Sequence, residues 1–199
     1  MLGYLLARAG VGVTVVEKHA DFLRDFRGDT IHPSTLQIMD ELGLLDAFLA
    51  LPHQKVPDLV AQFGDLRLRI ADFSHLPVKA PYIAMMPQWD FLNFLARHAA
   101  AYPNFRLLME TEATGLLTQN NGVAGIVATG PGGGLTIRAP LTIAADGRGS
   151  VLRAASGLPV TDFGVPMDVL WFRLPRSATD TDQTQGRFAS GHIFIMLNR

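Results

Sequence analysis

The stretch from Leu141 to Arg153 constrains the fold of this chain more strongly than any other segment. It begins with the apolar run Leu-Thr-Ile-Ala-Ala, continues through Asp146 and Gly147, and reaches Ser150, a residue type that commonly begins a helix. The apolar run does not alternate with polar residues, which is typical of a parallel strand covered on both faces. Because ligands of open α/β sheets bind beyond the carboxyl ends of such strands, Asp146 and Gly147 are predicted to lie at a ligand site.

Residue patterns along the rest of the chain predict further helices and strands. A helix that ends at Gly10, followed by a strand over 11–17, makes half of a βαβ unit whose first strand and phosphate-binding turn would precede Met1. Further helices are expected over 33–42, 46–51 and 88–102, a hairpin over 58–73, and strands over 105–109, 113–119, 123–129, 135–138, 141–145, 168–174 and 187–197. This order predicts an α/β domain around a parallel sheet, with an antiparallel meander as crossover and part of a second, sheet-rich domain. Since elements are cut at both ends, we expect the chain to be a fragment of a longer protein.

Composition and charge exclude several classes of function. A net charge of -1 with scattered arginines gives no basic face, which argues against nucleic acid as a partner. The absence of cysteine excludes disulfides and thiolate chemistry and is typical of a reducing compartment. No apolar run approaches the roughly 18 residues that span a bilayer, and the first residues lack the basic character of a signal peptide. The histidines show no metal-ligand spacing, so no metal ion is expected. Together with the missing membrane span and signal peptide, the composition predicts a cytoplasmic protein without membrane contact.

Three more residues are candidates for a small-molecule site, each with a simpler alternative. Glu17 ends the strand over 11–17, where an acid can accept hydrogen bonds from ribose hydroxyls; the alternative is a solvated acid. Arg27 lies in the charged loop 25–33 and would bind an anion or stack on a ring; the alternative is a capped loop with a solvated arginine. Gln88, at the edge of a buried helical stripe, needs partners that either a cofactor or a helix cap would supply.

The residues around Asp146 also have simpler explanations. An Asp-Gly pair is a common turn, and Ser150 is expected to serve as a helix N-cap. Arg153 either braces the loop or contacts a phosphate group. Gly3, in the first helix, would let that helix pack closely on the sheet.

The spacing Asp-Gly-x-x-Ser-x-x-Arg from Asp146 to Arg153 resembles the second cofactor motif of the class A flavoprotein monooxygenases, the family of p-hydroxybenzoate hydroxylase. Glu17, the Arg27 loop, Gln88 and Asp146 follow the order and approximate spacing of that family over nearly all of the chain. The resemblance implies a Rossmann-like FAD-binding domain with an antiparallel meander crossover, plus part of a sheet-rich substrate domain. The implied boundaries place residues 1–57 and 87–165 in the FAD-binding domain, and residues 58–86 and 166–199 in the substrate domain.

The resemblance also implies a reaction and a role for each candidate. Glu17 would hold the adenosine ribose, Arg27 would lie near the flavin, and Gln88 would bond the ribityl or pyrophosphate region. Asp146 and Gly147 would lie by the cofactor, in a motif used for both FAD and the nicotinamide cofactor. The implied enzyme is an FAD-dependent monooxygenase that hydroxylates an aromatic or similarly electron-rich small molecule with NAD(P)H and O2. No catalytic acid, base or nucleophile is assigned, and the substrate, the choice of NADH or NADPH, and the oligomeric state stay open.

Two alternatives lie outside that assignment. A related flavoenzyme, such as a halogenase or an isoprenoid reductase, uses the same cofactor domain. The Trp-x-Trp-x-Ile-Pro element of halogenases is matched only at its end by residues 170–175, which argues against that branch. From a different class, the chain would be a non-catalytic remnant or binding module of the same fold.

We expect the 199-residue chain by itself to bind FAD weakly or not at all. Two elements of the family pattern are absent: a Gly-x-Gly-x-x-Gly that would precede Met1 and a Gly-Asp motif that would follow Arg199. Without the first, the chain lacks the helix N-terminus that binds the pyrophosphate. Titration of the purified chain with FAD, followed by flavin fluorescence, measures this affinity, and tight stoichiometric retention of FAD would contradict the prediction.

Overall fold

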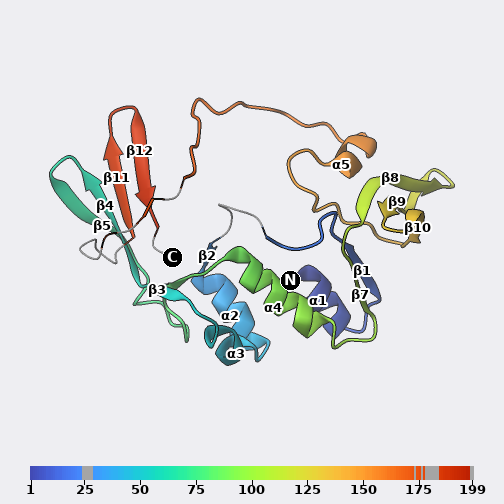
Figure 1. The fold of residues 1–199 in the computed structure, drawn as a ribbon, viewed down its shortest axis with the longest axis horizontal. Helices are drawn as coiled ribbons and strands as arrows, with labels where there is room; N and C mark the ends of the chain where they lie inside the picture. Colours follow the sequence, from blue (N-terminus) through green and yellow to red (C-terminus); the bar gives the residue numbers. More distant parts are fainter. Residues whose placement is uncertain (24–28, 173, 176, 178–183, 198–199) are drawn as a thin grey trace. The chain divides into compact units, whose positions relative to one another are not determined.

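The computed structural model describes residues 1–23, 29–172, 174–175, 177 and 184–197 (Figure 1). The chain divides into two compact units, each made of two separate stretches of sequence. Unit 1 contains Met1–Phe22 and Leu95–Val169, and unit 2 contains Leu23–Phe94 and Leu170–Arg199.

The first part of unit 1 is a helix on a small parallel sheet. Helix α1 (Leu2–Arg8) ends before Gly10, which has a φ of 84°, and strand β1 (Val13–Val16) follows. Strand β1 pairs in parallel with β7 (Phe105–Leu108). The predicted helix, its glycine stop and both strands are therefore confirmed.

Gly3 lets α1 approach this sheet closely. A Cβ atom at position 3 would lie 2.8 Å from the Val15 Cγ2 atom and 3.1 Å from the Phe105 ring. Both distances are shorter than ordinary van der Waals contact, so a larger residue at this position would force the Val15 or Phe105 side chain to shift. The close packing predicted for this glycine is confirmed.

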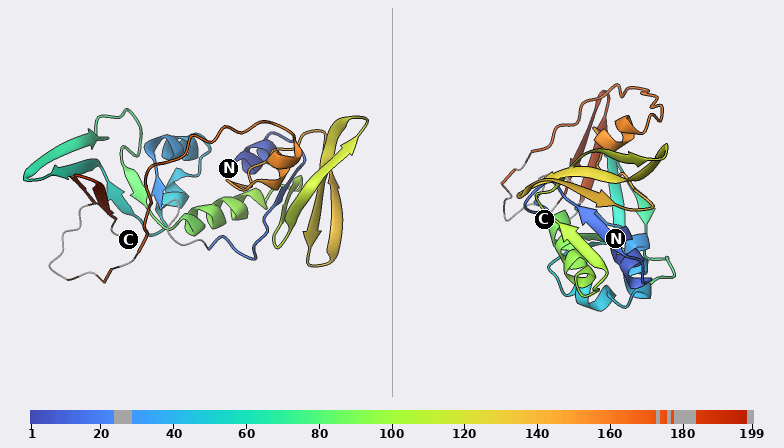
Figure 2. Two further views of the ribbon diagram at one scale, coloured as in Figure 1. Left: turned by 90° about the horizontal axis from the view of Figure 1, so that it is seen from above. Right: turned by 90° about the vertical axis from the view of Figure 1, so that its right-hand side faces the viewer.

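The rest of unit 1 is an antiparallel meander with a short helix. Strands β8 (Glu112–Gln119), β9 (Gly122–Gly130) and β10 (Gly133–Arg138) pair in the order β10-β9-β8, and Figure 2 shows them side by side. Helix α5 (Val151–Ala155) packs against β8. Its Leu152 side chain is buried with Ile126 and Ala128, which lie in β9. The predicted meander is confirmed.

A buried phenylalanine joins two helices of unit 2. Helices α2 (Pro33–Glu41) and α3 (Leu45–Leu49) are followed along the chain by α4 (Gln88–Ala99), whose C-terminal part from Leu95 belongs to unit 1. Phe48 of α3 is fully buried and makes edge-on ring contacts with Phe91 and Phe94 of α4. Helix α4 ends at Ala99 rather than at the predicted residue 102, because Pro103 disfavours helical backbone just before it.

Two sheets complete unit 2. The first contains β2 (Thr30–Ile31), β6 (Ile83–Met85) and β3 (Gln54–Val56), in that order and all antiparallel. The second has the order β12-β11-β4-β5, formed by β4 (Asp58–Phe63), β5 (Leu66–Asp72), β11 (Gln185–Ala189) and β12 (His192–Met196). The hairpin predicted around Gly64 is confirmed as β4 and β5, and the strand pattern over 187–197 corresponds to the hairpin of β11 and β12.

Two predicted strands are wrong. Residues 141–145 have no regular structure, and Leu141 is 72% exposed. The described residues of 168–174 also form no strand, and Leu170 is 83% exposed. An apolar run indicates a preference for burial, but a strand forms only where a neighbouring strand supplies hydrogen bonds. In the structure, residues 141–145 pair neither with the two-stranded sheet of β1 and β7 nor with the meander, so their backbone gains no ladder hydrogen bonds.

A search of the described residues for a helix long and apolar enough to cross a membrane finds none.

Replacing Gly125 with alanine should destabilise unit 1 strongly. Gly125 has a φ of 143°, and a Cβ atom there would lie 2.0 Å from the carbonyl oxygen of Ile137 on the paired strand β10. We expect a loss of at least about 2 kcal/mol in the free energy of unfolding, measured by urea denaturation. Gly132→Ala is the matched control, because a Cβ atom at this neighbouring turn meets no other atom within 4 Å. Equal stabilities of the two variants would contradict the prediction.

Candidate cofactor site

Glu17 lies directly after β1, at the carboxyl end of the parallel sheet. Its backbone N–H donates to the Leu108 carbonyl at 2.9 Å, and its own carbonyl accepts from Thr111 N–H at 2.9 Å. The half-buried side chain accepts a hydrogen bond from the His19 backbone N–H at 3.0 Å. A carboxylate group accepts hydrogen bonds from hydroxyl groups as well as from N–H groups.

Asp146 and the residues after it form a loop held by side-chain hydrogen bonds. The Ser150 hydroxyl donates to Asp146 Oδ1 at 2.5 Å, and the Ser150 Oγ atom accepts from the Arg153 backbone N–H at 2.9 Å. The Arg153 guanidinium donates to the carbonyl of Arg148. Ser150 is therefore the N-cap of α5, as predicted, and Arg153 braces the loop, one of the two roles that the sequence leaves open.

The charge of Asp146 follows from these contacts. The Ser150 hydrogen bond lowers the pKa of the Asp146 carboxyl below its ordinary value, and hydrogen bonding to the backbone N–H groups of Val151 and Leu152 lowers this pKa further. The group is therefore ionised at neutral pH. Its side chain is exposed, so it can also accept hydrogen bonds from a ligand.

Gly147 presents bare backbone beside this carboxylate. Its φ is 85°, a conformation that favours glycine, and no atom lies within 4 Å of the position that a Cβ would take. A ligand can approach the chain here without meeting a side chain. The sequence predicts this property from the Asp-Gly pair alone.

One apolar cluster fixes both acidic residues within unit 1. Leu152, in the helix that Ser150 caps, is buried in this cluster, and Val16, the residue before Glu17, packs against it. The cluster thus connects the end of β1 to the Asp146 loop. Sequence analysis misses this connection, because it depends on contacts between residues far apart in the chain.

Gln88 is the first residue of α4 and belongs to unit 2. It is half-buried, and its side-chain amide has no hydrogen-bond partner among the described residues. A half-buried amide gains free energy from a polar partner, which a bound ligand can supply. The helix-capping alternative receives no support from the hydrogen bonds in the described part of the chain.

Arg27 and most of its loop lie outside the described residues. The loop continues at Asp29, which is buried and whose carbonyl accepts from Met86 N–H at 2.9 Å. Arg27 therefore stays a prediction from sequence.

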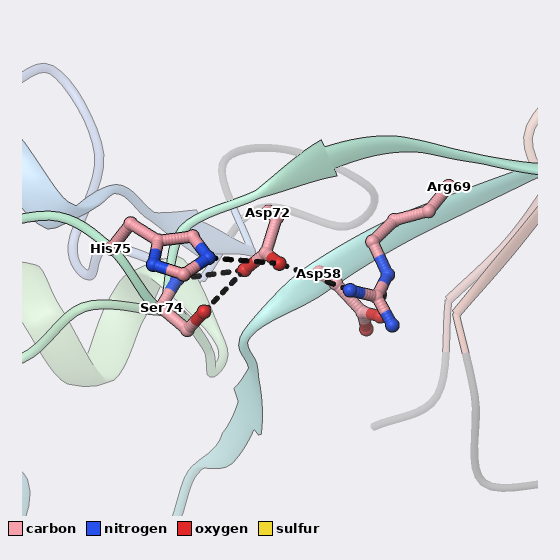
Figure 3. A network of polar contacts seen from close by, with 5 residues as sticks. All are labelled: Asp58, Arg69, Asp72, Ser74 and His75. Atoms are coloured by element: carbon pink, nitrogen blue, oxygen red, sulfur yellow. Dashed lines mark hydrogen bonds and ion pairs between the residues drawn. The ribbon is translucent and has the colours of Figure 1, made fainter.

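A second polar cluster combines the residue types of a hydrolase triad at the end of β5 (Figure 3). Ser74 Oγ donates to Asp72 Oδ1 at 2.5 Å, while His75 Nε2 lies 3.8 Å from Asp72 Oδ2. A triad needs the serine hydrogen-bonded to the histidine, but here Ser74 donates to the acid, and His75 is highly exposed. Arg69, which contacts Asp58 at 3.1 Å and Asp72 at 3.0 Å, completes an ion-pair network across the hairpin. We therefore assign this cluster a structural role and not a catalytic one.

No group of three or more metal-binding side chains occurs in the part of the chain that the structure describes. The exposed, ionised Asp146 and the fixed Glu17 suit the hydroxyl groups of a ribose or a polyol, and Gly147 suits close approach by a phosphate or a ring.

Comparisons with known proteins identify the fold family. The profile of the FAD binding domain family matches residues 1–199. The chain is 30% identical over 181 residues to a 6-methylpretetramide 4-monooxygenase from Streptomyces rimosus, a match that covers 90% of this chain and 43% of the relative. Among solved structures, a p-nitrophenol 4-monooxygenase from Pseudomonas putida is similar with a TM-score of 0.68 and 26% identity, covering 79% of this chain and 40% of the other.

An anhydrotetracycline hydroxylase from Streptomyces rimosus is similar with a TM-score of 0.68 and 27% identity, over 81% of this chain and 32% of the other. The chain therefore spans less than half the length of these relatives. The expected fold class is confirmed by this likeness to structures with Rossmann-like FAD-binding domains. With its whole length matched by the family profile, the chain belongs to the FAD binding domain family, and its resemblance to the flavoprotein monooxygenases is confirmed.

Proposed function

We propose that the chain forms the cofactor-binding part of an FAD- and NAD(P)H-dependent monooxygenase that hydroxylates an aromatic or similarly electron-rich small molecule with O2. The observation that carries the proposal is the Asp146 loop: an ionised, exposed carboxylate is held by Ser150 beside the bare backbone of Gly147. The three similar proteins reported above are monooxygenases or hydroxylases by name, which supports the same reaction class.

The residues in unit 1 fit an adenine dinucleotide. Gly3 allows α1 to pack closely on β1, as the helix of a dinucleotide-binding unit does. Glu17, fixed at the end of that strand, would accept hydrogen bonds from the adenosine ribose. Asp146 and Gly147 would lie against the cofactor and form part of its binding site.

The remaining assignments extend this proposal to the other candidates. Gln88 would bond the ribityl or pyrophosphate region through its side-chain amide, and Arg27 would lie near the flavin. We retain the division into an FAD-binding domain, residues 1–57 and 87–165, and a substrate domain, residues 58–86 and 166–199. A location in the cytoplasm also belongs to the proposal, on the basis of the cysteine-free composition.

FAD, when bound, supplies the electron transfer from NAD(P)H and the activation of O2. The residues of this chain bind and orient the cofactor through hydrogen-bond acceptors and bare backbone. None of them is assigned as a catalytic acid, base or nucleophile, because the hard chemistry belongs to the cofactor.

A non-catalytic binding module of the same fold is the alternative from another class. Activity of the full-length protein separates the two. We expect it to carry FAD, to oxidise NADH or NADPH, and to transfer one atom of labelled O2 to an aromatic probe, detected by mass spectrometry. The substrates named for the relatives, p-nitrophenol and anhydrotetracycline, are suitable first probes. FAD binding without any reduction by NADH or NADPH would favour the binding module.

Replacing Asp146 with alanine should weaken FAD binding by the full-length protein. Hydrogen bonds to charged groups are worth about 1.5–3 kcal/mol, so we expect the dissociation constant to rise at least about tenfold. Fluorescence quenching during titration of the apoprotein with FAD measures this constant. Asp162→Ala is the matched control, because Asp162 is an exposed acid of the same unit that bonds only locally, to Gly164 N–H at 2.8 Å. Equal affinities of the two variants for FAD would contradict the role of Asp146.

A further inference from the structure

We propose that Ser150 is the positioning residue of the cofactor site, because it ties the exposed Asp146 carboxylate to the first turn of α5 and so fixes its direction before the cofactor binds. This inference rests on the proposed function, in which Asp146 contacts FAD. Ser150 is not expected to contact the cofactor itself, since it is only 6% exposed.

The Ser150 hydroxyl donates one hydrogen bond and accepts another. Its hydrogen is donated to Asp146 Oδ1 at 2.5 Å, and its oxygen accepts from the Arg153 backbone N–H at 2.9 Å. A serine hydroxyl has a single proton, so donation to Asp146 fixes the orientation of the group. An ordinary helix N-cap needs only the hydrogen bond that its side-chain oxygen accepts from a backbone N–H. The donated bond is additional, and its partner is the carboxylate assigned to the cofactor.

Without such a tether, the carboxylate would be poorly placed. Residues 141–147 have no regular structure, and both Asp146 and Gly147 are exposed. The fixed part of the neighbourhood is α5, whose Leu152 is buried against Ile126 and Ala128 of the meander. Ser150 and the backbone N–H groups of Val151 and Leu152 link that fixed part to Asp146, and the Ser150 hydroxyl is the side chain that does so. A binding group held in its bound orientation loses less conformational entropy on binding, so the tether should raise affinity.

The other charged groups of the loop do not replace Ser150. The Arg153 guanidinium donates to the Arg148 carbonyl, so this contact braces the backbone of the loop. The side chain that donates to the Asp146 carboxylate is Ser150. No ion pair joins Asp146 to a described residue. The orientation of the carboxylate therefore depends on Ser150 and on the backbone N–H groups of the first turn of α5.

Three substitutions separate positioning from helix capping. Ser150→Thr keeps both hydrogen bonds. Ser150→Gly removes the hydroxyl at little cost to the cap, because glycine is also a favourable N-cap residue. Ser150→Ala removes both the hydroxyl and the cap. The Asp146 carboxyl is followed by carbon-detected NMR titration of the full-length apoprotein, and FAD affinity is measured on the same protein.

We expect Ser150→Thr to match the wild type within about twofold in FAD affinity and to keep the low pKa of Asp146. In Ser150→Gly and Ser150→Ala, the pKa of Asp146 should rise towards its ordinary value, because the donated hydrogen bond that stabilises the ionised form is gone. FAD affinity should fall about three- to tenfold in both, less than in Asp146→Ala. The double variant Asp146→Ala/Ser150→Ala should bind FAD no more weakly than Asp146→Ala alone, because Ser150 acts through Asp146.

Two results would overturn the inference while leaving the proposed function intact. One is an FAD affinity of Ser150→Gly equal to that of the wild type, measured alongside a loss of affinity in Asp146→Ala. The other is an additive loss in the double variant, which would mean that Ser150 acts independently of Asp146. If Asp146→Ala itself binds FAD like the wild type, the cofactor role of Asp146 fails, and the inference fails with it.

Discussion

The burial of Leu152 against the antiparallel meander is the contact on which the candidate site depends. Leu152 is buried in one cluster with Ile126 and Ala128 of β9, and Val16 packs against the same cluster from the end of β1. Because this one cluster holds both α5 and the end of the parallel sheet, it fixes the positions of Glu17 and the Asp146 loop. The meander therefore does more than connect β7 to the Asp146 segment: it supplies the surface on which α5 rests.

Electrostatics then determine what the loop can bind. Ser150 and the backbone N–H groups of α5 stabilise the ionised form of Asp146, while the exposed position of this carboxylate leaves it able to accept further hydrogen bonds. Gly147 adds open space next to the charge. This combination suits a polyhydroxylated ligand with a nearby phosphate, and it agrees with membership of the FAD binding domain family. The polar cluster at Asp72 shows the contrasting case. There Ser74 and Arg69 donate hydrogen bonds to the carboxylate, and the serine is bonded to the acid and not to His75.

Much of the fold could be predicted from local patterns. The spacing of Leu36 and Met39 gives α2 its buried face, Gly10 ends α1, and Gly64 lies in the turn between β4 and β5. The two wrong strands, over 141–145 and 168–174, share one physical cause. Their apolar residues express a preference for burial, which is local, whereas a strand also needs a partner that only the arrangement of other segments supplies.

The sequence by itself determined the family, the helices and hairpins, and the identity of Glu17, Asp146 and Gly147 as candidate cofactor residues, because residue type and spacing carry that information along the chain. The tertiary structure decided how those residues are held. It showed that Gly3 admits α1 onto the sheet, that Leu152 and Val16 share one cluster, and that Ser150 donates to Asp146 while Arg153 braces the loop. These features depend on distances between groups and on the direction of a single hydroxyl, which a residue pattern does not encode.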